Sequence, residues 1–282
     1  RRPPRSTPLY SSAASDVYKR QAKIINENKI SINDILIKNS RIEKIDPNIS
    51  VAYKFETINA EGLCLIPGLI DDQVHFREPG LTHKGEIYTE SMAAIAGGVT
   101  SYMEMPNTIP NATNIDELEK KYSIAKQKSF ANYSFYMGAT NNNYDEVLKI
   151  NKKNVCGIKI FMGSSTGNML VDNDDALKII FKNAETIITT HCEDENTIKT
   201  NTMKAIEKYG DNIPISEHPI IRSREACFQS SSKAIQLAKE FDTKLHVLHI
   251  STKEEINLFS NINLKDKKIT CEGCIPVSYT HL

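Results

Sequence analysis

The stretch LIPGLIDDQVHF at residues 65–76, followed by GEIYTESMAAIA at residues 85–96, shows the pattern that decides the fold. The first segment is an apolar, β-branched run typical of a strand, and the second has helical spacing. Six more apolar runs follow, at 100–105, 133–139, 157–162, 186–191, 244–250 and 268–271. Helical patterns come after them, at 115–127, 145–149, 174–182, 195–209, 222–241 and 252–259. This alternation predicts a parallel sheet with right-handed crossovers.

The number of these units favours a barrel over a short open sheet. Seven units over residues 67–276 make 210 residues, below the roughly 250 of a typical (β/α)₈ barrel. We therefore predict an α/β fold, a TIM-type (β/α)₈ barrel that lacks its last unit. Residues 22–66 contain short alternating β-branched runs separated by turn residues, which predicts a small antiparallel N-terminal β-domain, a partial β-sandwich.

The two ends of the chain differ in composition from the rest. Four of the eight Arg lie in the first twenty positions, there is no initiator Met, and residues 1–21 show no strand or helix period. We expect residues 1–21 to be non-native or disordered, and residues 277–282 to be non-native as well. The alternative is an ordinary flexible tail at each end.

The overall composition excludes several classes of protein. The 282 residues carry 35 Lys+Arg and 35 Asp+Glu, so no basic surface for nucleic acid is expected. Apolar runs are far shorter than the roughly 18 residues of a membrane span. Six scattered Cys in a long chain without a signal peptide favour reduced thiols. These features predict a soluble, cytoplasmic protein that acts on a small molecule.

Chemically active side chains lie at the ends of the predicted strands, where a barrel of this type builds its active site. Three of them are His75, His191 and His249, at the ends of three different strands. Imidazole is the commonest ligand of Zn²⁺, so a metal site follows as a hypothesis. A single His in such a place is more often a hydrogen-bonded core residue, but three of them together with a buried Lys are harder to explain that way.

Lys159 is that buried Lys, in the apolar run GIKIF. An unpaired ammonium there is costly, so we expect the side chain to be neutral, paired or chemically modified. A neutral amine can capture CO₂, and the carbamate could bridge two metal ions. The alternative is a Lys that reaches the barrel end or pairs with a carboxylate.

Two further patterns receive structural interpretations. His246 precedes His249 by three residues, so on a strand the two should face opposite sides, and only His249 should point to the barrel mouth. The helix at 115–127 carries several charges, including Lys120 and Lys121, which predict a solvated face.

Five segments in order resemble the dihydroorotases, cyclic-amide hydrolases of the amidohydrolase superfamily. They are IPGLIDDQVHFREPG (66–80), MPNT (105–108), GIKIF (157–161), THCED (190–194) and LHIST (248–252). The resemblance covers roughly residues 22–276 and implies reversible conversion of dihydroorotate and N-carbamoyl-L-aspartate in pyrimidine biosynthesis. It further implies that His75, Lys159, His191 and His249 hold one or two Zn²⁺ ions, with Lys159 carboxylated. Arg77 and Asn107 match the residues that hold the substrate carboxylate.

Two positions depart from the family pattern. Gln73 stands where relatives carry the first His of a His-x-His pair, which makes a single-metal site or weaker metal binding plausible. The family's strand-8 Asp, which ligates metal and moves the proton of the attacking water, has no counterpart in this chain. The catalytic residue is therefore unknown here, and we expect the fragment itself to be inactive.

Two alternatives stay open. A hydantoinase or allantoinase shares the barrel and the metal ligands, although Arg77 favours a substrate with a carboxylate. A non-catalytic dihydroorotase-like assembly partner, for instance of aspartate transcarbamoylase, is kept open by Gln73. A homo-oligomer is equally compatible with the sequence.

Overall fold

The computed structural model describes residues 16–50, 56–163 and 168–273. The chain divides into two compact units, one of residues 1–69 with 95–100 and one of residues 70–94 with 101–282. Residues 1–15 of the predicted non-native segment 1–21, and the predicted non-native residues 277–282, lie outside the described residues.

The first unit is built on a five-stranded sheet with the order β3-β2-β1-β4, in which β5 also pairs with β1. Its strands are β1 (Val17–Asn26), β2 (Lys29–Lys38), β3 (Arg41–Asp46), β4 (Glu56–Asn59) and β5 (Cys64–Leu65). A small core of Ala22, Ile35 and Ala60 lies under it. Asp34 is buried at 3% exposure and accepts hydrogen bonds from Tyr18 and from the backbone of Gln21 and Ile49. These bonds compensate the cost of burying its charge.

This unit differs from the sequence-based expectation in three ways. The segment 17–21 was expected to be unstructured, but it pairs with β2 and β4 and buries Val17 and Tyr18. The sheet is mixed, because β4 and β5 run parallel to β1. The described residues form one sheet here, where a sandwich of two sheets was expected. β4 pairs in parallel with β1 on the side opposite β2 and so extends the same sheet.

The second sheet confirms the predicted strand and helix alternation. Its seven strands lie in strict sequence order, and each pairing that involves β7 to β12 is parallel. The strands are β6 (Leu69–Val74), β7 (Val99–Glu104), β8 (Asn132–Gly138), β9 (Gly157–Phe161), β10 (Ile188–His191), β11 (Leu245–Val247) and β12 (Ile269–Cys271). Short parallel strands in sequence order need a crossover between each pair, and helices supply it.

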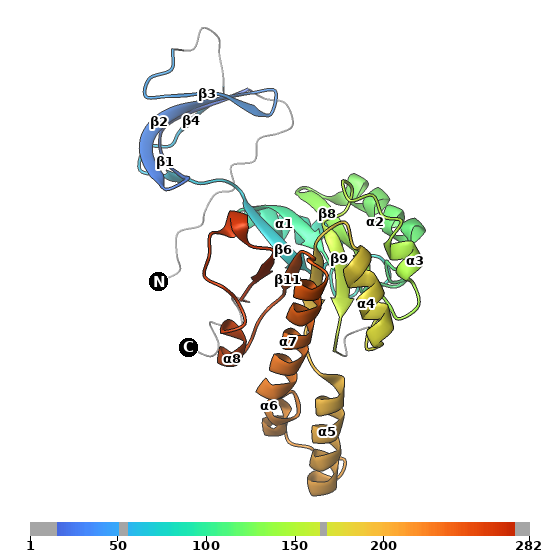
Figure 1. Cartoon of the computed structure of the whole chain (residues 1–282). Helices are drawn as coiled ribbons and strands as arrows, with labels where there is room; N and C mark the ends of the chain where they lie inside the picture. Colours follow the sequence, from blue (N-terminus) through green and yellow to red (C-terminus); the bar gives the residue numbers. More distant parts are fainter. Residues whose placement is uncertain (1–15, 51–55, 164–167, 274–282) are drawn as a thin grey trace. The chain divides into compact units, whose positions relative to one another are not determined.

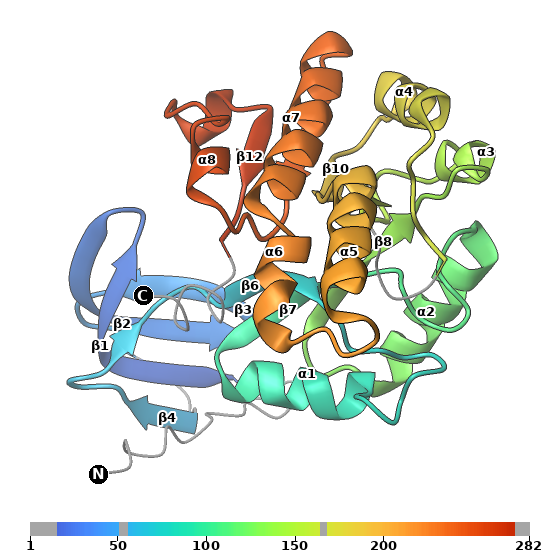
Figure 2. The ribbon, with the colours of Figure 1, turned by 90° about the horizontal axis from the view of Figure 1, so that it is seen from below.

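Helices follow the strands, and Figure 1 shows α2, α3 and α4 on the outside of β8 and β9. The helices are α1 (Ile87–Ala96), α2 (Ile115–Lys128), α3 (Tyr144–Val147), α4 (Asp174–Asn183), α5 (Glu195–Tyr209), α6 (His218–Ile221), α7 (Arg224–Glu240) and α8 (Lys253–Ile256), with short 3₁₀ turns at Ile215–Glu217 and Leu264–Asp266. Figure 2 shows α5 and α7 side by side next to the end of the sheet that carries β10 and β12. The helix predicted at 252–259 is shorter in the structure, where α8 begins at Lys253 and ends at Ile256.

Side-chain caps fix where these helices begin. Asn114, Asn173, Asp194 and Ser223 each accept a hydrogen bond from a backbone N–H of the first turn of α2, α4, α5 and α7, respectively. Such caps satisfy one of the otherwise unpaired N–H groups at a helix start. The caps therefore fix the residues at which these four helices begin.

The parallel sheet is strongly curled. β6 and β12 are its opposite edges, yet carboxylate oxygens of Asp72 in β6 and Glu272 after β12 lie within 4.8 Å of each other in a group with His246. The Tyr136 hydroxyl of β8 also donates to the Asp72 carbonyl at 3.0 Å. Side chains from distant strands therefore meet inside the curl. Among the described residues, no helix combines the length and apolar character needed to cross a bilayer.

Helix α4 provides a test of the packing outside the sheet. Its buried face includes Leu177, at 1% exposure, whereas Leu264 is 77% exposed. We expect Leu177→Ala to lower the free energy of unfolding by about 2–5 kcal/mol, because it removes buried methyl groups and leaves a cavity. Leu264→Ala is the matched control and should change it by less than about 0.5 kcal/mol. Urea unfolding measures both, and equal effects would contradict the assigned core.

Candidate active site

Two of the predicted metal ligands are in direct contact. His191 is the last residue of β10, and His249 follows β11 by two residues. Their Nδ1 and Nε2 atoms, respectively, lie 3.2 Å apart, and the ring centroids are 5.0 Å apart. Burial, together with the nearby His191 and Lys159, lowers the pKa of His249 to about 4. The ring of His249 is therefore neutral at physiological pH, the form that a metal ligand requires.

The third predicted ligand, His75, lies just beyond β6. Burial lowers its pKa to about 3, the positive charges of Arg77 and Lys159 add to this effect, and a hydrogen bond with Asn107 acts against it. The Nδ1 atom of His75 is buried and has no hydrogen-bond partner among the described residues. A neutral imidazole with a free buried nitrogen suits a ligand that is not part of the chain.

Arg77 and Asn107 show the same unsatisfied character. Asn107 is 4% exposed, and its Oδ1 atom and the Nη1 atom of Arg77 are buried without a hydrogen-bond partner in the described part of the chain. Arg77 has a φ of 70°, the left-handed region that costs energy for a residue with a side chain. Its backbone N–H donates to Glu104 at 3.1 Å, which helps to hold this conformation. Strained backbone with unpaired polar atoms is typical of a binding site.

Lys159 lies at the centre of β9 and is 1% exposed. Its Nζ atom finds no hydrogen-bond partner among the described residues and lies 4.6 Å from the centroid of the Phe161 ring. Burial lowers the pKa of Lys159 to about 7. Its charge contributes to the lowered pKa values of both His75 and His249, so the amine lies within electrostatic range of both rings. The structure thus brings Lys159 into the neighbourhood of the histidines, and no carboxylate in the described part of the chain is hydrogen-bonded to it.

A buried ion pair contacts the backbone at Arg77 and close to Asn107. Lys121 of α2 and Glu104 at the end of β7 are each 1% exposed and lie 2.9 Å apart. Lys121 also donates to the Met105 carbonyl at 2.8 Å, two residues before Asn107. Burial lowers the pKa of Lys121 and raises that of Glu104, and the pair opposes both shifts. The expectation that Lys121 lies on a solvated face is therefore wrong, because this residue turns inward to meet Glu104.

A second supporting group binds His191. Glu193 accepts a hydrogen bond from His191 Nε2 at 2.9 Å and is also paired with Arg222. Burial alone would raise the pKa of Glu193, but the hydrogen bonds from His191 and Arg222 outweigh it and hold the pKa at about 2. The segment THCED contains Glu193, but Arg222 lies 29 residues further along the chain. The sequence offers no signal for that pairing.

His246 takes part in a further group that the sequence analysis missed. Its Nε2 atom lies 3.7 Å from Asp72 and 3.6 Å from Glu272, and all three side chains have metal-ligating chemistry. Burial and the neighbouring Glu272 raise the pKa of Asp72 to about 6. β11 ends at Val247 and His249 has a φ of 39°, so strand alternation counted from His246 does not reach His249, and the expected opposite orientation of the two rings stays a prediction. Alternation cannot be carried beyond the end of a strand.

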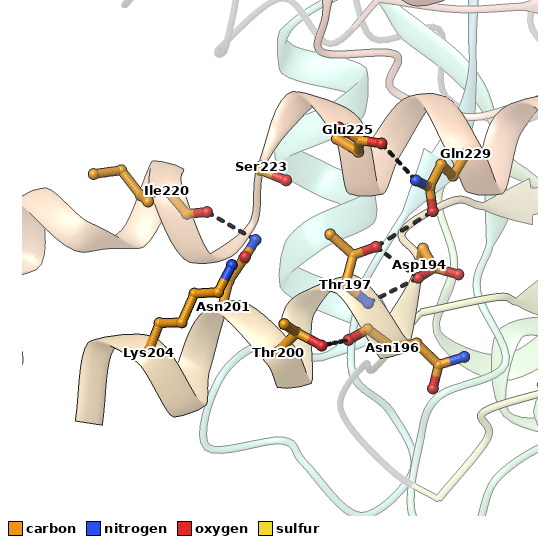
Figure 3. Close-up of a pocket in the computed structure, with 10 residues that line it drawn as sticks. All are labelled: Asp194, Asn196, Thr197, Thr200, Asn201, Lys204, Ile220, Ser223, Glu225 and Gln229. Carbon is orange, nitrogen blue, oxygen red and sulfur yellow. Dashed lines mark hydrogen bonds between the residues drawn. The ribbon is translucent and has the colours of Figure 1, made fainter. Parts of the chain in front are cut away.

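Two cavities lie near these residues. One of about 190 Å³ is lined by His191, His249, Glu193, Arg222 and neighbouring side chains. A larger one, about 690 Å³, lies between α5 and the start of α7, as Figure 3 shows. Its polar side chains bond to one another, including Thr197 to Asp194 and to Gln229. The smaller cavity contains the imidazoles and is therefore the better candidate for chemistry.

Relatives of known name support the assignment of a family. A profile described as dihydro-orotase-like matches residues 62–255. A dihydroorotase of Methanosarcina acetivorans is 30% identical over 247 residues, covering 86% of this chain and 52% of the relative. An L-hydantoinase of Paenarthrobacter aurescens is 27% identical over 265 residues, covering 92% of this chain and 57% of the relative. The structure of an L-hydantoinase from Arthrobacter aurescens superimposes with a TM-score of 0.84 at 25% identity, covering 92% of this chain and 58% of that one.

The chain belongs to the dihydro-orotase-like family, as the five sequence segments indicated. The solved structure confirms the α/β fold with its curled parallel sheet. The chain spans little more than half the length of the curated relatives it matches. The roles of His75, Lys159, His191, His249, Arg77 and Asn107 stay predictions.

The buried ion pair gives a stability prediction with a neighbouring control. Lys121→Met should lower the free energy of unfolding by about 3–5 kcal/mol, because it leaves the Glu104 carboxylate buried without its partner. Lys120 pairs with Glu117, but its side chain is 62% exposed. Lys120→Met should therefore change stability by less than about 1 kcal/mol. Comparable losses in urea unfolding would show that the Lys121 pair is not buried.

Lys159 gives the opposite prediction. Lys159→Met replaces an unpaired buried amine by an apolar chain of similar size, so the metal-free protein should gain about 1–3 kcal/mol of unfolding free energy. The same substitution should weaken zinc binding, since Met cannot form a carbamate. Thermal unfolding and a zinc titration on one preparation measure both effects. A variant that loses stability would mean that Lys159 has a partner in solution.

Proposed function

We propose that the protein of which this chain is part is a zinc-dependent dihydroorotase, with the seven units belonging to a (β/α)₈ barrel. The observation that carries the proposal is the set of unsatisfied or neutral polar groups gathered inside the sheet. It comprises the imidazoles of His75 and His249, the buried amine of Lys159, the guanidinium of Arg77 and the amide of Asn107. Native interiors normally satisfy such groups, so this concentration indicates a site built for a metal ion and a polar substrate.

The residues fit a zinc ion by their chemistry. Two nitrogens bound to one tetrahedral zinc ion are about 3.3 Å apart, close to the 3.2 Å between His191 Nδ1 and His249 Nε2. His75 and a carboxylated Lys159 would complete the ligand set. Because Gln73 stands where the family pattern has a His ligand, the proposal assumes one zinc ion and not two. The chemistry supplied by a bound ion is polarisation of the amide carbonyl and activation of water at neutral pH.

Arg77 and Asn107 perform the recognition in this proposal. The guanidinium fork of Arg77 can bind a carboxylate with two parallel hydrogen bonds, and the Asn107 amide can add another. Glu104 holds the Arg77 backbone at 3.1 Å, and Lys121 holds Met105 near Asn107 at 2.8 Å. The backbone that carries both recognition groups is therefore held before the substrate arrives, which lowers the entropic cost of binding.

A second candidate is a hydantoinase-type enzyme that opens uncharged cyclic ureides. The structural similarity to an L-hydantoinase from Arthrobacter aurescens favours it. The two candidates make different demands on Arg77, because an uncharged ring has no carboxylate for the guanidinium to bind. An allantoinase from Salmonella at 27% identity belongs to the same alternative.

The substrate test uses the whole protein of which this chain is part, expressed from its complete open reading frame. Zinc and bicarbonate are supplied during expression. Hydrolysis of dihydroorotate should exceed that of dihydrouracil, and Arg77→Lys should raise the KM for dihydroorotate about tenfold or more by removing the fork. The rate with dihydrouracil should not change in the variant. Preference for dihydrouracil in the unchanged protein would favour the hydantoinase. Bound zinc without any turnover would favour a non-catalytic assembly partner.

A further inference from the structure

The carboxylate of Glu193 lies between a ring nitrogen of His191 and the guanidinium of Arg222. His191 Nε2 is 2.9 Å from Glu193 Oε2, and Arg222 Nε donates to Glu193 Oε1 at 2.8 Å. Arg222 Nη2 also donates to Glu193 Oε2. The Glu193 side chain is 10% exposed and that of Arg222 33%, so the three groups form a partly desolvated chain of charge-assisted hydrogen bonds.

Several elements converge to fix this arrangement. Glu193 lies between β10 and α5, whereas Arg222 lies between α6 and α7. The backbone of Asp194 donates to the Ala226 carbonyl of α7 at 2.9 Å, which ties the two segments together. Gly163, after β9, packs so closely that a Cβ there would approach Glu193 Cβ to 2.7 Å. The carboxylate is therefore placed by the fold and has little freedom to turn away.

The arrangement determines which nitrogen of His191 carries a proton. A carboxylate that receives two bonds from a guanidinium is ionised and can only accept, so His191 Nε2 must be the N–H donor. In a neutral ring, Nδ1 then keeps its lone pair. That lone pair faces His249 Nε2, at 3.2 Å. Glu193 therefore holds the Nε2 side of the His191 ring, and Nδ1 is available to a metal ion.

We propose that Glu193, held by Arg222, is a positioning residue that fixes the tautomer and ring orientation of His191 so that its Nδ1 atom can bind the catalytic metal. The inference rests on the metal centre of the proposed function and adds a role for two residues outside the ligand set. Partners of this kind on the far side of a ligating imidazole commonly change metal affinity by about 10–100-fold. A purely structural role, tying the β10–α5 turn to α7, would leave the ring tautomer unchanged.

The test compares Glu193→Gln and Arg222→Lys with a control at the first residue of α7. Arg224→Gln removes an arginine from an exposed pair with Glu254 at 3.4 Å, whose side chains are 74% and 47% exposed. Zinc affinity is measured by competition with a chromogenic chelator. Glu193→Gln should weaken it about 10–100-fold, and Arg222→Lys should weaken it less because the charge is kept. The control should match the unchanged protein.

A second measurement separates positioning from mere stability. Long-range ¹⁵N–¹H spectra of the metal-free protein report which nitrogen of the His191 ring is protonated. The unchanged protein and Arg224→Gln should show the Nε2–H form, and Glu193→Gln should show a mixture or the Nδ1–H form. Unaltered zinc affinity and an unaltered tautomer in Glu193→Gln would overturn the proposal.

The two readouts also distinguish this inference from the proposed function. If the unchanged protein binds no zinc, the metal centre itself is refuted, and the tautomer measurement then decides the positioning role alone. If Glu193→Gln does not fold, Arg222→Lys carries the same test, because Glu193 then keeps its carboxylate but loses the fork. A tautomer unchanged in that variant, with unaltered zinc affinity, would count against the proposal.

Discussion

The burial of the Lys159 amine inside the curled sheet is the constraint on which the site depends. An amine in that position is costly in its charged form, and burial lowers its pKa to about 7. The same burial, with the added charges of Arg77 and Lys159, lowers the pKa of His75 and keeps that ring neutral. One physical cause, removal of water from the inside of the sheet, therefore lowers the pKa of the Lys159 amine and of the His75 and His249 rings.

Two ion pairs, one buried and one partly buried, flank this interior. Glu104 with Lys121 holds the backbone on the Arg77 and Asn107 side, and Glu193 with Arg222 holds His191 on the other. Such pairs contribute little net stability, but breaking one leaves a buried charge, so they specify geometry strongly. The unsatisfied atoms of the site are thus flanked by charged groups that are paired with one another. This contrast is what separates a prepared binding site from a poorly packed core.

Much of the fold and part of the candidate site could be predicted from the sequence. The strand and helix alternation predicted the parallel sheet, since apolar runs and helical periods are local properties of the chain. The strand-end rule selected His191 and His249, which the structure places in contact. The Lys121, Arg222 and Asp72 contacts could not be found in this way. Each depends on a partner far along the chain. In the case of Lys121, the charged residues of its helix predicted a solvent-exposed face, because the sequence does not show that Glu104 lies opposite.

The sequence by itself determined the order of the elements and the chemical types at the strand ends. It also determined membership of the family, through motifs in which spacing along the chain is enough. The tertiary structure decided which of those groups lie without partners, how Asp72 and Glu272 meet across the curl, and which nitrogen of His191 faces His249. The physical reason is that burial and hydrogen bonding are properties of neighbours in space. The curl of the sheet brings together side chains from strands that lie far apart along the chain.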